Sequence, residues 1–446
     1  MAASLRSARD IAVSVLARVE AGNAFANVLL QSAIDRADLS ELDAGLTYEL
    51  VLGVLRHRAR VDWTLQGTLR HPLERLTPRI RAILRAGIYQ IVFLPRIPAH
   101  AAVDEAVTLA HRYGHRGTVK LVNAVLRRIA AEGERALPEG DPVERLAVEH
   151  SHPRWLVERW LARFGSDETA RLCAANNQAG PSTVRINSLR CAPEEAARRL
   201  RDAGGIVRPT ALPEGYETDG APVARRALAA EGILTVQDLG AMLVTDLLDP
   251  QPDEVVIDGA AAPGGKTTHI AERMRGRGRV IACDVHQGKL ERLSRRAAVM
   301  GLDSIEAHHQ DARTLGRAFR HQAHRLLLDA PCTGFGVLRR RPDIKWRAGP
   351  GDIQAMADLQ REMLGGAADA LRPGGILVYS VCTFEDEEGQ NVIADFLRRH
   401  PEFTPDGGRT LPGAFPGAAV GPGEVLLLPH RHGTDGFYIA RLRRRG

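Results

Sequence analysis

Two short segments each place a cysteine where a predicted parallel strand ends. Leu326–Gly336 reads LLLDAPCTGFG and contains Cys332, and Leu377–Thr383 reads LVYSVCT and contains Cys382. In an open α/β sheet, ligands bind in the crevice beyond the carboxyl ends of the strands. We therefore expect both thiols at one crevice, although a free cysteine is also commonly a buried structural residue.

A pair of thiols in one site suits methylation of carbon 5 of cytosine. That carbon is too electron-poor to take a methyl group directly, but a thiolate that adds at carbon 6 turns the ring into a nucleophilic enamine. After methylation, a second group must help to remove the carbon-5 proton so that the thiolate can leave. One cysteine can attack and the other can assist release, and the residues alone leave their order open.

Features suited to a cofactor follow the three strands predicted before these cysteines. The loop Asp258–Lys266 (DGAAAPGGK) opens a helix, and its small residues let a ligand approach the helix N-terminus. It lacks the GxGxxG order of a dinucleotide site. Asp284 ends the second strand, where an acid can bind ribose hydroxyls, and Asp311 follows the third, placed for an adenine amino group. Each aspartate alone is more often a helix cap, but in this order they favour S-adenosylmethionine.

The elements that must position these residues begin near residue 250. Short apolar runs alternate with helical stretches, which is typical of a doubly wound parallel sheet. The predicted strands are 255–257, 278–284, 325–328 and 375–379, together with the strand that precedes Asp311, and the predicted helices are 266–274, 287–300, 352–371 and 387–399.

The first half of the chain has a different pattern. Residues 5–130 show helical periodicity throughout, and the polar stretch 132–141 suggests a linker. A small α+β module follows, with a helix at Pro153–Phe164 and a strand at Thr183–Ile186. We expect an all-α domain over 1–140, the small module over 145–245 and an α/β Rossmann-like domain over 246–446.

Positive charge is concentrated in residues 51–130. This segment holds thirteen arginines and Lys120 against four acidic residues, a net charge of +10, whereas the whole chain carries +6. Such a local excess is typical of nucleic-acid binding, and the alternative is a solvated surface in an arginine-biased protein. We expect phosphate contacts from its arginines, among them Arg56, Arg58, Arg60, Arg79, Arg81 and Arg85.

Bulk properties exclude several classes. Five scattered cysteines form neither a disulfide framework nor a CxxC metal site, so we expect no bound metal and a reducing compartment. The N-terminal residues lack an apolar core segment and no stretch has the length of a membrane span. We expect a cytoplasmic monomer without membrane contact.

Three motifs resemble those of a known family. VIDGAAAPGGKTTHIAE, LLLDAPCTGFGVLRRRPDIKW and LVYSVCTFEDEEGQNV are similar to the motifs of the RNA cytosine-carbon-5 methyltransferases of the Nop2/Sun (Fmu) type. The basic helical segment, which ends in KLVNAVLR, resembles the RNA-binding fold of the antitermination factor NusB. A NusB-like domain fused to this core is the arrangement of the ribosomal RNA small subunit methyltransferases B.

The resemblance implies roles for individual residues. Cys382 would be the nucleophile at carbon 6, Cys332 would assist release, and Asp329 would hold the base near ring nitrogen 3. Trp346 could stack on a base or belong to a core. Cofactor contacts would come from Ala260, Ala261, Ala262, Pro263, Gly264, Gly265, Lys266, Asp284, Asp311 and Asp329, with Lys266 at the methionine carboxylate. RNA phosphates would be met by Arg339, Arg340, Arg341, Lys345 and Arg347.

The function expected from these features is methylation of a cytidine in 16S ribosomal RNA with S-adenosylmethionine as methyl donor. The RNA could be naked or part of a partly assembled small subunit. Three alternatives remain: the same chemistry on transfer RNA or another RNA, a non-catalytic RNA-binding or ribosome-assembly factor, and, more distantly, a nicotinamide dehydrogenase.

Overall fold

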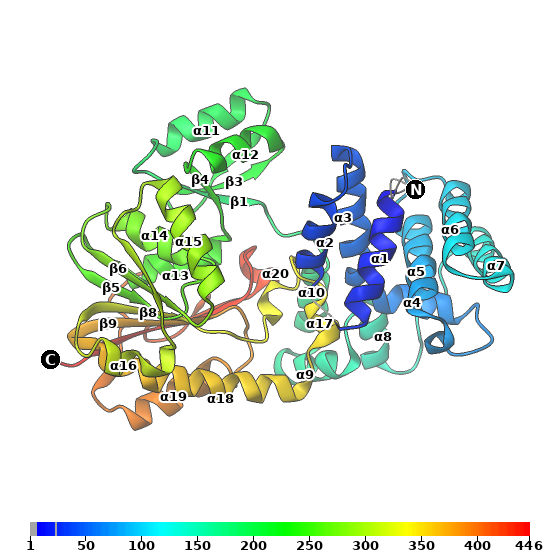
Figure 1. Cartoon of the computed structure of the whole chain (residues 1–446). Helices are drawn as coiled ribbons and strands as arrows, with labels where there is room; N and C mark the ends of the chain where they lie inside the picture. Colours follow the sequence, from blue (N-terminus) through cyan, green and yellow to red (C-terminus); the bar gives the residue numbers. More distant parts are fainter. Residues whose placement is uncertain (1–6, 23–24) are drawn as a thin grey trace. The chain divides into compact units, whose positions relative to one another are not determined.

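The computed structural model describes residues 7–22 and 25–446. The expected start of the helical segment at residue 5 lies outside these residues. The described chain forms two compact units (Figure 1). The first unit comprises Met1–Gln178 and Leu338–Ala348, and the second comprises Ala179–Val337 and Gly349–Gly446. The first unit therefore includes a segment that follows the Cys332 loop in sequence.

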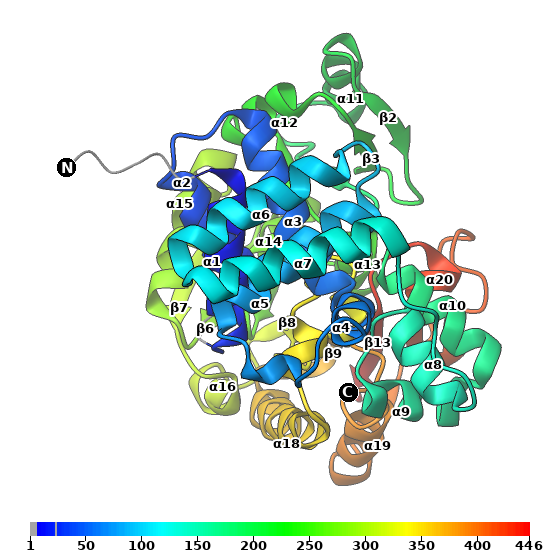
Figure 2. The ribbon, with the colours of Figure 1, turned by 90° about the vertical axis from the view of Figure 1, so that its right-hand side faces the viewer.

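The first unit is helical, as the periodicity predicts. Helices α6 and α7 pack side by side (Figure 2). The helices are α1 (Ala8–Glu20), α2 (Ala26–Asp35), α3 (Glu41–Arg56), α4 (Arg58–Gln66), α5 (Pro78–Phe93), α6 (Ala99–Tyr113), α7 (Arg116–Glu132), α8 (Pro142–Glu149), α9 (Arg154–Phe164), α10 (Ser166–Asn176) and α17 (Ile344–Arg347).

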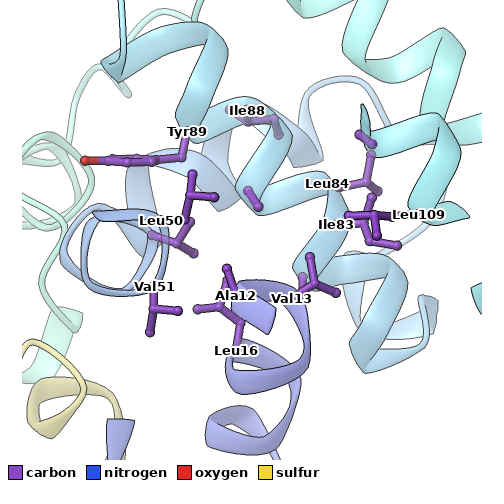
Figure 3. Packing of buried hydrophobic residues seen from close by; sticks show 14 of the residues in the cluster. Ala12, Val13, Leu16, Leu50, Val51, Ile83, Leu84, Ile88, Tyr89 and Leu109 are labelled. Carbon is purple, nitrogen blue, oxygen red and sulfur yellow. The ribbon is translucent and has the colours of Figure 1, made fainter. Parts of the chain in front are cut away.

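Apolar faces of α1, α3 and α5 meet in the core of this unit (Figure 3). Val13 and Leu16 of α1 are buried together with Leu50 of α3 and Leu84 of α5. Removing such side chains from water is the main favourable contribution to folding. The Tyr89 ring lies in the same core, and its hydroxyl donates to Glu49 Oε1 at 2.5 Å.

The segment Leu338–Ala348 completes the ends of two helices in the first unit. Asp343 Oδ2 accepts a hydrogen bond at 3.0 Å from the backbone N–H of Ala26, the first residue of α2. The N-cap residue of α2, Phe25, has no side chain that could do this. At the C-terminal end of α3, Lys345 Nζ donates to the carbonyl of Arg56 at 3.0 Å, and Trp346 Nε1 donates to the carbonyl of Leu55 at 2.6 Å. Backbone groups that helix ends leave unpaired are thereby satisfied.

The second unit begins with a small antiparallel sheet whose strand order is β2-β3-β1-β4. Arg185 of β1 is fully buried and donates to both carboxylate oxygens of Glu272 and to the carbonyl of Gly265, each at 2.8 Å. These bonds attach the small sheet to helix α14. The elements are β1 (Thr183–Ile186), β2 (Ile206–Pro209), β3 (Gly215–Asp219), β4 (Leu234–Val236), α11 (Pro193–Asp202) and α12 (Pro222–Ala230).

A larger mixed sheet carries the sites predicted from the sequence. Its order is β11-β12-β13-β9-β8-β5-β6-β7, with β10 paired to β13, and helices cover both faces (Figure 1). The strands are β5 (Val255–Asp258), β6 (Arg279–Asp284), β7 (Ile305–His309), β8 (Ala323–Asp329), β9 (Leu371–Val381), β10 (Phe403–Pro405), β11 (Ala419–Gly421), β12 (Glu424–Leu427) and β13 (Phe437–Arg444). The helices are α13 (Leu239–Leu248), α14 (Gly265–Arg273), α15 (Gln287–Met300), α16 (Leu315–Ala318), α18 (Pro350–Ala367), α19 (Gln390–Arg399) and α20 (Pro429–His432).

The predicted fold class is confirmed, with one addition. The strands from β5 to β9 pair in parallel, as expected of a doubly wound sheet. Strands β10 to β13 pair antiparallel and extend the sheet beyond β9, which the sequence did not predict. Within the described residues, no helix combines the length and apolar character that crossing a bilayer requires.

Two glycines of α3 should respond oppositely to alanine. A Cβ at Gly53 would lie 2.1 Å from the buried Tyr89 ring, so we expect Gly53→Ala to destabilise the protein by roughly 1–3 kcal/mol. A Cβ at exposed Gly45 would meet nothing within 4 Å, so Gly45→Ala should stabilise it by about 0.5–1 kcal/mol. Thermal unfolding of the full chain, followed by circular dichroism, measures both. Equal midpoints for the two variants would contradict the packing described for Tyr89.

Candidate active site

The two predicted cysteines meet at the carboxyl edge of the large sheet. Cys382 directly follows β9, and Cys332 lies three residues beyond the end of β8. Because β8 and β9 are parallel neighbours with Asp329 opposite Ser380, both loops leave the sheet at the same edge. The two Sγ atoms lie 3.3 Å apart, and the backbone N–H of Gly336 donates to the Cys382 carbonyl at 3.0 Å.

The surroundings of Cys332 favour its protonated, thiol form. The hydrogen bond with Cys382 raises the pKa of Cys332 well above its usual value, and burial and the charges of Cys382, Glu388 and Asp329 act in the same direction. Cys332 therefore stays protonated, and either sulfur can be the donor in the hydrogen bond between the two. A thiolate is the nucleophilic form of cysteine.

Asp329 connects the cysteine loops to the cofactor loop. Its Oδ2 accepts from Lys266 Nζ at 2.6 Å, and its Oδ1 accepts from the Ser380 hydroxyl at 2.6 Å. Burial alone would lower the pKa of Lys266, but the charge and hydrogen bond of Asp329 outweigh burial and raise it. The lysine predicted at a methionine carboxylate thus pairs with Asp329 in this structure. The role of Asp329 toward a base remains a prediction.

The cofactor loop is tied to the acid after the second strand. The Asp284 carboxylate accepts hydrogen bonds from the backbone N–H groups of Ala262 at 3.2 Å and His286 at 2.8 Å. Gly264 has a φ of 103° and a Cβ there would lie 2.8 Å from Leu293, so glycine suits this turn for two reasons. Asp284 thus lies beside the Ala260–Lys266 loop, and its contact with ribose hydroxyls remains a prediction.

Asp311 caps a short helix. Its Oδ1 accepts from the backbone N–H of Arg313 at 2.9 Å, and its Oδ2 pairs with the Arg313 guanidinium at 2.7 Å. These hydrogen bonds hold the pKa of Asp311 below its usual value. Asp311 is thus a helix cap, which is the alternative that the sequence also allowed, and its contact with adenine remains a prediction.

Asp258 is a site residue that the sequence did not single out. It ends β5 and is 1% exposed. Its Oδ2 accepts a hydrogen bond from the Thr267 hydroxyl at 2.7 Å, while its Oδ1 is buried without a hydrogen bond. Burial raises its pKa to about 7. A buried oxygen with an unused lone pair at the head of the cofactor loop fits the ammonium group of S-adenosylmethionine. Its place directly after the apolar run Val255–Ile257 was the available signal.

Some of the basic residues that follow Cys332 are buried, and others are exposed. Lys345 is 1% exposed and Arg339 is 7% exposed, so the expected contacts of both with RNA phosphates are corrected: these side chains are buried in the first unit. Burial lowers the pKa of Lys345 to about 7, and its amine serves the end of α3. Arg340 is half-buried and Arg347 is exposed, and their RNA contacts remain predictions.

Trp346 and two of the expected arginines are also accounted for by packing. Trp346 packs against the core of the first unit, so of the two roles expected for it, stacking on a base or packing in a core, the structure shows the second. Arg81 and Arg85 both pair with Glu20 at 2.9 Å, and Arg85 also pairs with Asp62 at 2.6 Å. These two arginines are engaged inside the domain, which corrects their expected role at phosphates.

Comparisons with known proteins agree with this architecture. Family models match the 16S rRNA methyltransferase RsmB/F over residues 245–443, the NusB family over 6–131 and the RsmF/B-like ferredoxin-like domain over 152–219. A probable ribosomal RNA small subunit methyltransferase B of Bacillus subtilis is 38% identical over 99% of both chains. The ribosomal RNA small subunit methyltransferase B of Pseudomonas putida is 37% identical over 97% of this chain and 98% of its own.

Solved structures share the fold. The crystal structure of the protein PH0851 is 28% identical, with a TM-score of 0.83 over 98% of this chain and 99% of that chain. A methyltransferase homolog protein from Pyrococcus horikoshii is 27% identical, with a TM-score of 0.58 over 68% of this chain and 99% of its own.

With the doubly wound sheet, the family match over residues 245–443 identifies an S-adenosylmethionine-dependent RNA methyltransferase. With full-length relatives at this identity, the chain belongs to the family of ribosomal RNA small subunit methyltransferase B.

Asp284 provides a test of the cofactor site. We predict that Asp284→Ala binds S-adenosylmethionine roughly 10- to 100-fold more weakly, because a charge-assisted hydrogen bond contributes about 1.5–3 kcal/mol. Isothermal titration measures the affinity, and Asp253→Ala, at an exposed carboxylate paired with Arg277, is the matched control. Wild-type affinity in the Asp284 variant would show that this acid only holds the loop. Binding of NAD by the wild-type protein would instead favour a dehydrogenase.

Proposed function

We propose that the protein methylates carbon 5 of a cytidine in small-subunit ribosomal RNA through a covalent cysteine adduct. The observation that carries the proposal is the 3.3 Å separation of the Cys332 and Cys382 sulfurs beside Asp329. The names of the full-length relatives support the ribosomal RNA substrate.

Cys382 carries out the first step in this proposal. Its thiolate forms a bond to carbon 6, and the electron pair of the 5,6 double bond moves toward the base edge, where Asp329 would hold ring nitrogen 3. S-adenosylmethionine supplies the electrophilic methyl group when bound. Asp258, Asp284 and the Ala260–Lys266 loop would hold it at the neighbouring strand ends.

Cys332 acts after methyl transfer. Once Cys382 is bonded to carbon 6, its sulfur is neutral and no longer accepts the thiol proton. Two of the effects that raise the pKa of Cys332, the hydrogen bond and the charge of Cys382, are then absent. Cys332 becomes easier to ionise, and its thiol proton passes to water. Its thiolate then accepts the carbon-5 proton, the electron pair of the broken C–H bond re-forms the 5,6 double bond, and the bond between carbon 6 and the Cys382 sulfur breaks, which restores the Cys382 thiolate.

The two cysteines should fail differently. Cys382→Ala removes the attacking sulfur, so neither an adduct nor methylated RNA should form. Cys332→Ala leaves attack possible but slows release, so enzyme should accumulate covalently bound to RNA. A denaturing gel of each variant incubated with labelled ribosomal RNA and S-adenosylmethionine measures the adduct, and Cys191→Ala, a half-buried cysteine outside the site, is the control. The reverse pattern would exchange the two roles, and full activity in both variants would refute the two-thiol mechanism.

The first unit is proposed to supply RNA affinity through α7. Arg116, Lys120 and Arg127 are exposed, and spacings of four and seven residues place them on one face of this helix. Three arginines of the same unit form ion pairs that already neutralise their charge: Arg60 with Glu134, Arg128 with Glu132 and Arg145 with Glu149.

Replacing Arg116, Lys120 and Arg127 together by glutamine should weaken RNA binding and lower the slope of log affinity against log salt by about two to three units, because each phosphate contact releases a counterion. The matched triple variant of Arg60, Arg128 and Arg145 should change the slope less. Filter binding to ribosomal RNA over a range of salt concentrations measures both. Equal slopes in the two triple variants would remove α7 from the proposed RNA surface.

A further inference from the structure

Glu388 lies in the loop between β9 and α19 and is fully buried. Its Oε2 accepts hydrogen bonds from the backbone N–H of Thr333 at 2.8 Å and from Gln360 Nε2 at 3.1 Å. Its Oε1 accepts from the Thr333 hydroxyl at 2.5 Å. The Tyr379 hydroxyl donates to its backbone carbonyl at 2.6 Å. In the site described above, this carboxyl group appears only as one of the charges that raise the pKa of Cys332.

These contacts hold the chain on both sides of Cys332. Thr333 follows this cysteine, and Pro331 precedes it, with a carbonyl that accepts from the same Gln360 amide at 2.9 Å. The Thr333 hydroxyl also lies 3.3 Å from that of Thr383, the residue after Cys382. The carboxylate thus contacts the Cys332 loop directly and the Cys382 loop only through Thr333.

The charge of Glu388 is available near neutral pH. Burial raises its pKa to about 7, although the hydrogen bonds from Thr333 and Gln360 favour the charged form, and the charge of Glu385 raises it further. Burial also keeps the facing Tyr379 hydroxyl protonated, because the pKa of Tyr379 lies well above its usual value. Glu388 therefore gains its charge as the pH rises through 7.

We infer that Glu388 is a positioning residue that fixes the Cys332 loop and whose charge keeps the shared proton of the thiol pair on Cys332, leaving the negative charge on Cys382. A charge in a site of low dielectric disfavours a second like charge nearby, and Glu388 contacts the neighbour of Cys332 rather than that of Cys382. The inference rests on the proposed two-thiol function and adds what decides which sulfur attacks. No bond to Glu388 forms or breaks.

The relative reactivity of the two thiols tests this role without RNA. Limiting iodoacetamide is added to the full-length protein between pH 6 and 8.5, and mass spectrometry gives the alkylation rates of Cys382 and Cys332. In the wild type, the ratio of the Cys382 rate to the Cys332 rate should rise as the pH passes through 7. In Glu388→Gln, which keeps the size of the side chain, the ratio at pH 8 should be about tenfold lower and should no longer rise.

Glu387→Gln is the matched control, since it removes the neighbouring, half-buried carboxylate, and it should behave as the wild type. An unchanged ratio in Glu388→Gln at pH 8, even with a lowered unfolding temperature, would make Glu388 a purely structural residue. A wild-type ratio that stays flat from pH 6 to 8.5 would overturn the inference without any variant. Retained methylation by Cys382→Ala would instead refute the proposed function, whatever the labelling ratio.

Discussion

The parallel pairing of β8 with β9 is the constraint on which the site depends. Asp329 stands opposite Ser380, so the loops that leave these two strands begin side by side at one edge of the sheet. β8 is almost wholly buried, and β9 is buried from residue 375 to 381. A one-residue slip would move each side chain to the opposite face of the sheet and disrupt this packing, so the register is strongly specified. The approach of Cys332 to Cys382 and the bond between Ser380 and Asp329 are both consequences of that register.

Acidic groups around the thiols are kept where they are least well solvated. Burial raises the pKa values of Asp258 and Glu388 to about 7, and within the described residues neither carboxyl group forms an ion pair with a basic side chain. Burying a carboxylate in this way costs stability, which the surrounding sheet must offset. Perturbed carboxyl groups concentrated at one sheet edge are typical of a catalytic site rather than of a structural core. By contrast, the buried carboxylate of Glu272 forms an ion pair with the buried guanidinium of Arg185.

Local sequence patterns predicted the catalytic sheet well and other features poorly. The apolar runs before Asp284 and Asp329 mark buried parallel strands, because such strands read as continuous hydrophobic stretches. The sequence did not predict strands β10 to β13, because three of them are only three or four residues long and they form an antiparallel edge of the sheet. Lys345 was misplaced because lysine is rarely buried, and its acceptor, the Arg56 carbonyl, lies 289 residues away in sequence. Glu388 was overlooked in a run of acidic residues that resembles a solvated loop.

The segment Leu338–Ala348 bears on how separable the parts of this chain are. The polypeptide enters the first unit twice and passes between the units at Gln178, Val337 and Ala348, not at a single linker. A fragment cut after Gln178 would leave the start of α2 without Asp343 and the end of α3 without Lys345 and Trp346. We therefore expect such a fragment to be less stable than the same unit in the full chain. Residues 338–348 belong to the methyltransferase region by sequence and to the first unit by their contacts, so a substitution in this segment can affect the stability of a unit whose other residues end at Gln178.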